Sequence, residues 1–203
     1  MSGENGILIV IEGLDGAGLS TQAAALAEYL RGKNKGVMLT KEPTTSPIGK
    51  LIKSALNRNP ELSLFALQLL FAADRAEHLE TEIEPALSAN EIVISDRYIL
   101  SSLAFGAVDN DVEFLKEINS RFRKPDLTVI IDTPPRVCLD RITRSRDNVE
   151  LFEEERRLEK VRKQFLALKN YFDNTFIVAG NREKAKVSKD IKEVVERTLV
   201  GAV

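Results

Sequence analysis

Short apolar runs alternate along the chain with longer segments of helical periodicity, and this alternation limits the fold more than any other feature of the sequence. Continuous apolar runs are typical of strands that are buried on both faces of a parallel sheet. The sequence therefore predicts a single α/β domain over residues 1–203, with a doubly wound, five-stranded parallel sheet and helices on both faces. The predicted strands are Ile7–Glu12, Gly36–Glu42, Glu91–Ser95, Leu127–Asp132 and Thr175–Val178.

Helical patterns occupy the segments between these runs. A charged break interrupts the pattern between the fourth and fifth strands, around Arg144–Glu150, and we expect the helix to stop there. The predicted helices are residues 20–33 with Gly32 near the end, Ile48–Leu56, about Ser63–Leu87, Arg136–Tyr171 on either side of the break, and about Val187–Leu199.

The composition excludes several classes of protein. The formal net charge of −2 provides no basic field, so we expect no nucleic-acid partner. Cys138 is the only cysteine, which excludes a disulfide within the chain and fits a reducing compartment. The apolar run of residues 7–11 is too short for a signal peptide or a membrane span. We therefore expect a cytoplasmic protein that has no membrane partner.

The first predicted strand leads directly into the segment GLDGAGLST, residues Gly13 to Thr21. Its spacing matches the phosphate-binding pattern G-x-x-x-x-G-K-[ST] at Gly13, Gly18 and Ser20, but Leu19 stands at the lysine position. A glycine-rich turn between a strand and a helix directs backbone N–H groups and the positive end of the helix dipole at one anion. The segment therefore predicts a phosphate site, and the alternative is a tight turn that binds nothing.

Two polar side chains of this loop indicate further chemistry. The Ser20 hydroxyl is of the kind that binds Mg²⁺ beside a nucleotide. Asp15 places a carboxylate inside an anion site, which is unfavourable unless that carboxylate faces a different group. We therefore expect Asp15 to face a hydroxyl group of a second substrate.

A second group of residues predicts a site for an acceptor. Phe71 and Arg75 are four residues apart and share a helix face, where an aromatic ring and a forked donor can read a base. The alternative is a core phenylalanine beside a surface arginine. Asp96 and Arg97 follow the third strand, at the edge where open α/β sheets bind ligands. There Asp96 can hold Mg²⁺ through water and Arg97 can bind a phosphate, or the two can form structural ion pairs.

The chain resembles the thymidylate kinases, which are P-loop nucleoside monophosphate kinases that make dTDP from dTMP and ATP. The matching segments, in the order and spacing of that family, are EGLDGAG-ST, KEP, LLFAADRAEHL, PAL, DRY--SSLAF and CLDRI…F-E---LEKVR--FLAL, and they extend over nearly the whole chain. The resemblance implies a P-loop kinase fold with a short helical lid at about residues 142–153. It also implies ATP as the donor, Mg²⁺ as the metal, and a role in dTTP synthesis.

The resemblance implies a role for each matching residue. The ATP site would comprise Gly13, Leu14, Asp15, Gly16, Ala17, Gly18, Leu19, Ser20, Thr21 and, toward the adenine, Arg141. Ser20 and Asp96 would hold the metal. The dTMP site would comprise Asp15, Glu42, Pro43, Lys53, Phe71, Arg75, Arg97, Ser101 and Phe105. Within it, Asp15 would bind the 3′-hydroxyl, Phe71 and Arg75 would bind the base, and Arg97 and Lys53 would bind the acceptor phosphate.

The resemblance further implies a homodimer, formed through the apolar helices around Leu64–Leu70 and through the Ile99–Phe105 segment. The sequence departs from the family pattern at three places: Leu19 replaces the loop lysine, TTSP follows Glu-Pro, and Gly106 stands where many members have a polar contact to the base.

The replacement at Leu19 bears on the reaction, because that lysine places a point charge on the transferring phosphate. We expect an active kinase whose missing charge comes from the lid arginines, so that the catalytic residues are Asp15, Arg97, Arg144 and Arg146. A solvated loop is the alternative interpretation of the two lid arginines. The alternatives for the whole chain are a kinase for another nucleoside monophosphate and a nucleotide-binding paralogue without meaningful turnover.

Overall fold

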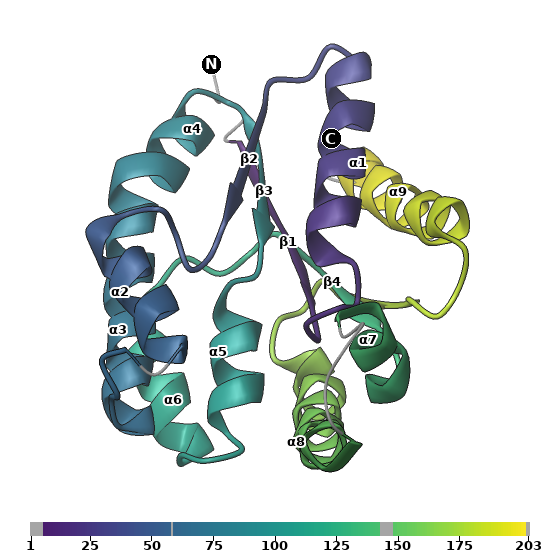
Figure 1. Ribbon diagram of the computed structural model, residues 1–203. Coiled ribbons are helices and arrows are strands. Elements are labelled where there is room, and N and C mark those ends of the chain that lie inside the picture. Colours follow the sequence, from purple (N-terminus) through teal and green to yellow (C-terminus); the bar gives the residue numbers. More distant parts are fainter. Residues whose placement is uncertain (1–5, 58, 143–147, 202–203) are drawn as a thin grey trace.

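The computed structural model describes residues 6–57, 59–142 and 148–201. At its centre lies a five-stranded, wholly parallel sheet with the strand order β2-β3-β1-β4-β5 (Figure 1), which confirms the predicted sheet. The strands are β1 (Ile7–Gly13), β2 (Val37–Lys41), β3 (Ile92–Asp96), β4 (Leu127–Asp132) and β5 (Thr175–Ala179).

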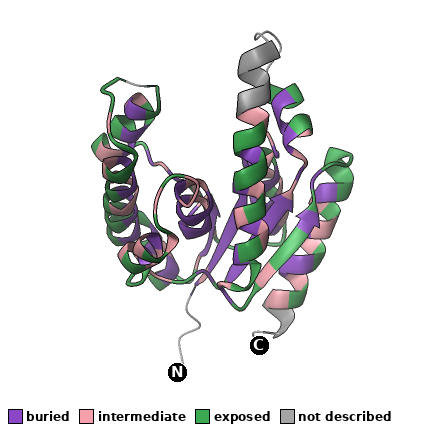
Figure 2. Cartoon of the chain, turned by 90° about the horizontal axis from the view of Figure 1, so that it is seen from below, coloured by how far each residue is buried: buried purple, intermediate pink, exposed green. Residues whose placement is uncertain are grey.

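The middle strands are apolar because both of their faces are covered. Every residue of β3 is buried, as are most residues of β1 and β4. In β5, at the edge of the sheet, only Val178 is buried. In Figure 2 the buried residues gather along the sheet and in the segments packed against it. The register pairs Asp96 at the end of β3 with Ile11 of β1 and with Lys41 of β2, so the carboxyl ends of three strands lie together.

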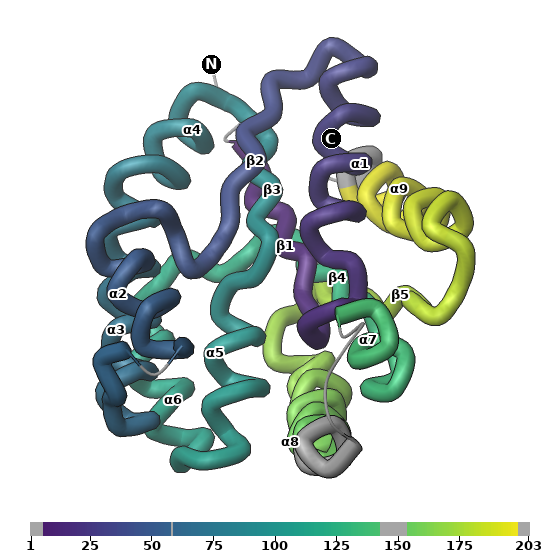
Figure 3. Tube along the Cα trace, viewed as in Figure 1, coloured from purple at the N-terminus to yellow at the C-terminus, as the bar shows by residue number. Residues whose placement is uncertain are grey.

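Helices cover both faces of this sheet. The chain crosses from strand to strand through α1 (Leu19–Gly32), α2 (Pro47–Leu56), α3 (Leu64–His78), η1 (Leu79–Ile83), α4 (Glu84–Ser88), α5 (Ile99–Gly106), α6 (Val112–Asn119), α7 (Pro135–Ile142), α8 (Asn148–Ala167), η2 (Leu168–Asn170) and α9 (Lys184–Gly201). The last helix, α9, returns beside α1 on one face (Figure 3), while α4 and α5 lie against the opposite face (Figure 1).

The long helical region predicted around Ser63–Leu87 contains an irregularity. The α-helix ends at His78, a π-helical turn spans Leu79–Ile83, and an α-helical turn follows. Pro85 lies just after the π-helical turn. Proline lacks the N–H group of a helical hydrogen bond, and its ring clashes with the carbonyl four residues earlier, so the backbone before it widens.

Helices α5 and α6 were not predicted; in α5 the sequence ILSSLAFG carries little polar–apolar contrast, whereas α6 is short but amphipathic and follows the N-cap residue Asp111. Six of the eight residues of α5 are buried, and the helix packs between β1, α3, α6 and α8. A helix that is apolar on most sides belongs inside a protein. The expectation that Ile99–Phe105 forms a dimer interface is therefore wrong, since Ile99, Leu100 and Leu103 are covered by the chain itself.

Two helices, α7 and α8, occupy the region predicted as helix between β4 and β5. Of the predicted break around Arg144–Glu150, residues 148–150 belong to α8. Residues 143–147 lie outside the described residues, and with them Arg144 and Arg146. The prediction of a lid at about residues 142–153 therefore remains a prediction.

Candidate active site

The glycine-rich loop joins β1 to α1 and has a backbone that requires its glycines. Gly13, Gly16 and Gly18 have φ angles of 147°, 79° and 97°. A Cβ atom on Gly16 would lie 2.5 Å from the carbonyl oxygen of Cys138, too close for any side chain. Gly18 is the N-cap residue of α1 and has no side chain, so no side-chain hydrogen bond caps the first N–H groups of this helix. The first N–H groups of α1 therefore point into the loop, as an anion site needs.

Ser20, Lys41 and Asp96 meet beside this loop. The Ser20 hydroxyl donates to Oδ2 of Asp96, and the Lys41 ammonium lies 3.0 Å from the same oxygen and 3.2 Å from Ser20 Oγ. The other oxygen of Asp96, Oδ1, is buried and has no hydrogen-bond partner within the described part of the chain.

Ser20 and Asp96 fit the predicted Mg²⁺ site, because Mg²⁺ prefers oxygen ligands and is commonly held by one or two protein groups together with phosphates and water. Within the described residues no cluster of three or more His, Cys, Asp or Glu side chains could hold a metal ion by itself. The donor set here suits a metal that arrives with a nucleotide.

Arg97 lies between the loop and the acceptor side. It adopts a φ angle of 76° directly after β3, and its guanidinium donates to the Gly13 carbonyl and to Ser101 Oγ, each at 2.9 Å. It also forms an ion pair with Asp15 at 2.7 Å and lies over the ring of Phe105. Both Arg97 and Asp15 line the cavities on either side of them. The guanidinium is thus held in one place, at the edge where the sheet binds ligands.

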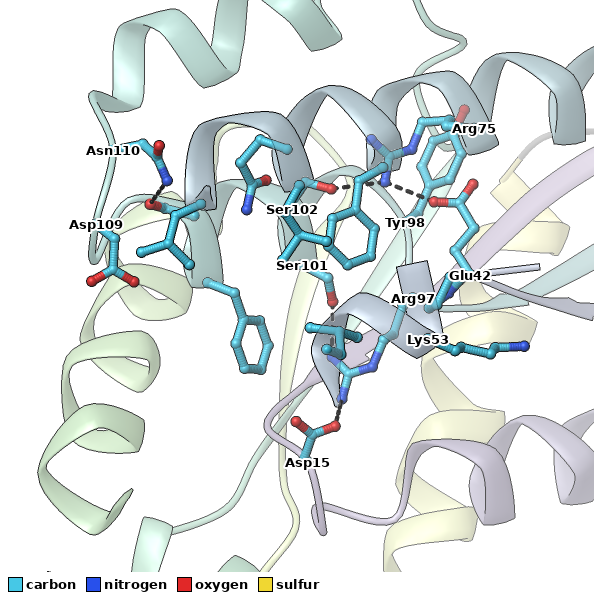
Figure 4. Close-up of a pocket in the computed structure, with 18 of the residues that line it drawn as sticks. Asp15, Glu42, Lys53, Arg75, Arg97, Tyr98, Ser101, Ser102, Asp109 and Asn110 are labelled. Atoms are coloured by element: carbon cyan, nitrogen blue, oxygen red, sulfur yellow. Dashed lines mark hydrogen bonds and ion pairs between the residues drawn. The ribbon is translucent and has the colours of Figure 1, made fainter. Parts of the chain in front are cut away.

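A cavity of about 400 Å³ opens beside Arg97, between α3, α5 and the end of β2 (Figure 4). The structure brings to its wall every residue that the sequence predicted for the acceptor, namely Asp15, Glu42, Pro43, Lys53, Phe71, Arg75, Arg97, Ser101 and Phe105. Phe71 and Arg75 share the predicted helix face. Lys53 donates to the carbonyl of Thr44 at 2.8 Å, so its ammonium is fixed at one end of the cavity.

Arg75 is buried, with 1% of its surface exposed, so the alternative of a surface arginine is wrong. Its guanidinium donates to Glu42 Oε2 at 2.7 Å, to Ser102 Oγ at 3.0 Å and to Asn119 Oδ1. Glu42 also contacts Nδ1 of His78 at 3.2 Å. Figure 4 shows Glu42 and Ser102 on either side of the Arg75 guanidinium. This network orients the guanidinium before any ligand enters, which lowers the cost of binding.

A second cavity, of about 630 Å³, lies on the other side of Arg97, over the glycine-rich loop. Its wall includes Arg141, whose guanidinium donates to the carbonyls of Gly16 at 3.2 Å and Gly180 at 3.1 Å. Arg141 thus braces the loop from α7, and its predicted role toward the adenine remains a prediction. The predicted loop residues that line this cavity are Leu14, Asp15, Gly16, Gly18, Leu19, Ser20 and Thr21.

Comparison with known proteins shows the family of the chain. A sequence model of the family described as thymidylate kinase matches residues 11–191. Three relatives, each named "probable thymidylate kinase", come from Pyrococcus abyssi (39% identity, covering 97% of this chain and 98% of the relative), Thermococcus kodakarensis (41%, covering 96% and 99%) and Pyrobaculum aerophilum (40%, covering 94% and 97%). The chain belongs to the thymidylate kinase family. It is therefore a phosphotransferase that binds nucleotides.

Leu19, which stands at the lysine position of the phosphate-binding pattern, lies in the hydrophobic core with 5% of its surface exposed. Its Cδ2 atom lies 3.3 Å from the position that a Cβ on Gly13 would take. The side chain packs beneath the loop and contributes apolar contacts there. It supplies no polar group to the donor-side cavity.

Gly106, the other departure within the acceptor site, leaves space that Gln68 of α3 fills. A Cβ on Gly106 would lie 3.0 Å from Gln68 Oε1, and both residues line the acceptor cavity. Gln68 is 7% exposed, and its Oε1 has no hydrogen-bond partner among the described residues. An amide from α3 therefore occupies the place beside the glycine.

Several residues of the site were missed by the sequence reasoning. Lys41 precedes Glu42 and Pro43 at the end of an expected strand, and its position at that edge was the available signal. Ser102 and Asn119, which hold Arg75, lie in the two helices that were not predicted. Glu12 interrupts an apolar strand, which is itself a signal of a special role.

Glu12 is buried, and burial raises the pKa of its carboxyl group from 4.5 to about 7, against the opposing effects of hydrogen bonds from Ser101 and of the nearby Arg97 charge. Its Oε1 accepts the backbone N–H groups of Tyr98 at 3.0 Å and Ser101 at 3.1 Å.

The described helices include none that is long and apolar enough to cross a membrane.

Proposed function

We propose that this enzyme transfers the γ-phosphoryl group of ATP to dTMP and produces dTDP and ADP. The observation that carries the proposal is that the donor-side and acceptor-side cavities meet at the same three residues, Asp15, Lys41 and Arg97. A phosphoryl group that passes between two nucleotides needs two adjoining sites with positive charge at the junction. The names of the relatives support dTMP as the acceptor.

On the donor side, we assign the ATP phosphates to the N–H groups of the loop and the adenine to the side of Arg141. Ser20 and Asp96 would hold Mg²⁺, which neutralises charge on the phosphates when it is bound. Arg97, together with Arg144 and Arg146 of the predicted lid, would neutralise the phosphoryl group in transfer. Asp15 and these arginines form the proposed catalytic set.

On the acceptor side, Phe71 would stack on thymine and Arg75 would donate to the base from its prearranged network. Asp15 would accept a hydrogen bond from the 3′-hydroxyl, and Lys53 and Arg97 would bind the acceptor phosphate. Glu42 acts through Arg75, which it orients at 2.7 Å, and is thus a positioning residue. The remaining walls of the pocket would be Pro43, Ser101 and Phe105.

We further propose that the chain works as a homodimer in the cytoplasm, as one kinase domain with a lid at about residues 142–153. Exposed apolar side chains on α2 and α3 support the dimer. Cys138 is buried and unpaired, and a reducing compartment keeps such a thiol in that state.

A coupled assay of ADP release with dTMP, dUMP, dCMP and UMP tests the function. We expect the highest kcat/KM with dTMP. A higher value with another nucleotide would identify a kinase of different specificity, and ATP binding without ADP release from any of the four would identify a paralogue that has lost turnover.

A further inference from the structure

The position of Leu19 leaves the donor-side cavity without the cation that the phosphate-binding pattern normally provides. The leucine side chain is packed into the core and presents no charge to this cavity. Any charge that compensates for the missing lysine must therefore reach the phosphates from another element of the fold.

Lys41 reaches the loop from the end of β2. The parallel register places Lys41 directly beside Asp96, and its ammonium lies 3.2 Å from the hydroxyl of Ser20, the residue that follows Leu19. The sheet thus fixes the backbone position of Lys41. The side chain is 52% exposed, so the ammonium at the end of its flexible stem can follow a ligand.

The other cations that line the donor-side cavity are more fully engaged with the protein. Arg141 donates to the carbonyls of Gly16, Ala17 and Gly180, and Arg97 donates to Gly13, Ser101 and Asp15. Lys41 instead contacts the two side chains that fit a metal–nucleotide complex, Ser20 and Asp96. An incoming nucleotide phosphate would meet its ammonium at the junction of both cavities.

We propose that Lys41 replaces the loop lysine and binds the γ-phosphate of ATP during transfer. The inference rests on the proposed kinase activity. In that reaction an oxygen of the acceptor phosphate forms a bond to the γ-phosphorus, and the bond from the γ-phosphorus to the bridging oxygen breaks. The bonding electron pair leaves with ADP. Lys41 keeps its proton throughout and stabilises the charge on the γ-phosphate oxygens.

Lys41→Met is the direct test, because methionine keeps much of the length of the side chain and removes the charge. We expect kcat to fall roughly 10²- to 10³-fold, the usual effect of losing one such donor. Calorimetry should show weaker binding of a non-hydrolysable ATP analogue, with little change for AMP, which lacks the γ-phosphate. The melting temperature should stay close to that of the wild type. Lys50→Met, which removes an exposed lysine from α2, is the matched control and should change none of these values.

A rescue experiment separates replacement of the loop lysine from other roles. In the Lys41→Met background, the additional change Leu19→Lys should raise kcat by about tenfold or more over that of Lys41→Met. In the wild-type background, Leu19→Lys should leave kcat nearly unchanged. A rise of roughly 10³-fold from Leu19→Lys alone would overturn the proposal, since it would show that nothing compensates for the missing lysine.

Two further results would also overturn the proposal. One is a Lys41→Met enzyme that keeps wild-type kcat and analogue affinity while Arg144→Met or Arg146→Met abolishes turnover, which would assign the charge to the lid. The other is a loss of activity matched by a large fall in melting temperature, which would make Lys41 a structural ion-pair residue. Failure of the proposed kinase function is distinguishable, because the wild-type enzyme would then release no ADP with any acceptor.

Discussion

The carboxyl group of Glu12 ties the end of β1 to the turn that follows β3. It accepts the backbone N–H groups of Tyr98 and Ser101 and the hydroxyl of Ser101, in the segment that directly follows Arg97. Because its pKa is raised to about 7, the folded protein favours the neutral form of this group. The protonation state of this buried side chain therefore changes near neutral pH.

Glu12 gives the protein a pH-dependent stability. The folded state binds the extra proton between pH 4.5 and about 7, so the contribution of Glu12 to the free energy of unfolding falls as the pH rises through this range. We expect Glu12→Gln, which mimics the neutral form, to gain up to about 3 kcal/mol over the wild type between pH 4.5 and pH 8. Urea unfolding at both pH values measures the difference.

The exposed Glu80 provides the control, because Glu80→Gln should show the same difference from the wild type at both pH values. If the difference between Glu12→Gln and the wild type were also independent of pH, the Glu12 carboxyl would titrate near its ordinary pKa and this interpretation would be wrong.

At the scale of elements, the connection from β2 to α2 is held to α3 by Asp74. This buried carboxylate accepts from the backbone N–H of Thr44 at 2.8 Å, from its hydroxyl at 2.6 Å and from Ser46 Oγ at 2.9 Å. Ser46 in turn caps the N-terminus of α2, where it accepts the N–H of Gly49 at 3.0 Å. The TTSP segment thus serves to fix the loop that carries part of the acceptor site.

Asp74→Ala should loosen this loop without touching the donor side. The change removes the acceptor of the Thr44 N–H and of the Thr44 hydroxyl proton. We expect a loss of about 3 kcal/mol in the free energy of unfolding together with a roughly tenfold rise in KM for dTMP. The affinity for ADP should stay unchanged. Urea unfolding, steady-state kinetics and calorimetry measure the three quantities.

Glu77→Ala, an exposed change on the same helix, is the matched control and should leave all three quantities as in the wild type. An equal loss of affinity for dTMP and ADP in Asp74→Ala would mean that Asp74 supports the whole site and not this one loop.

The strands and the loop could be predicted from the sequence because their signals are local. A run such as ILIVIEG followed by closely spaced glycines predicts a buried strand and a glycine-rich turn from neighbouring residues alone. Helix α5 could not be predicted in this way, since it is apolar on most sides and its helical period is hidden. The π-helical turn Leu79–Ile83 depends on how Pro85 is accommodated within a packed helix, which local patterns do not reveal.

At the scale of the whole molecule, the acceptor cavity depends on contacts between distant segments. The wall residues were predicted one motif at a time, whereas the partners of Arg75 come from the end of β2, from α5 and from α6. The position of Lys41 beside Asp96 likewise follows from the strand order, because β2 pairs with β3 and not with β1. Such neighbours appear only once the sheet is assembled.

Helices α2 and α3 pack against each other and carry the exposed large apolar side chains Leu51, Leu56, Leu64, Phe65 and Leu69. Of these, Leu56 and Leu64 line the acceptor cavity and Phe65 stacks on Phe114 of α6, whereas Leu51 and Leu69 take part in neither. Exposed apolar surface of this extent is typical of an interface. The exposed side chains of α3 fall within the predicted Leu64–Leu70 region, which supports the proposed homodimer.

The dimer prediction can be tested at Leu69, which lies on α3 and is 43% exposed. In a twofold dimer the same face of both chains meets, so Leu69→Glu introduces two carboxylates into one interface. We expect light scattering to give the wild type a mass of twice 22.6 kDa and the variant a mass of 22.6 kDa. Phe176→Glu, an exposed change on the edge strand β5, is the control and should remain dimeric. A wild-type protein that is monomeric at micromolar concentration, or a folded Leu69→Glu variant that dimerises as tightly as the wild type, would exclude this surface as the interface.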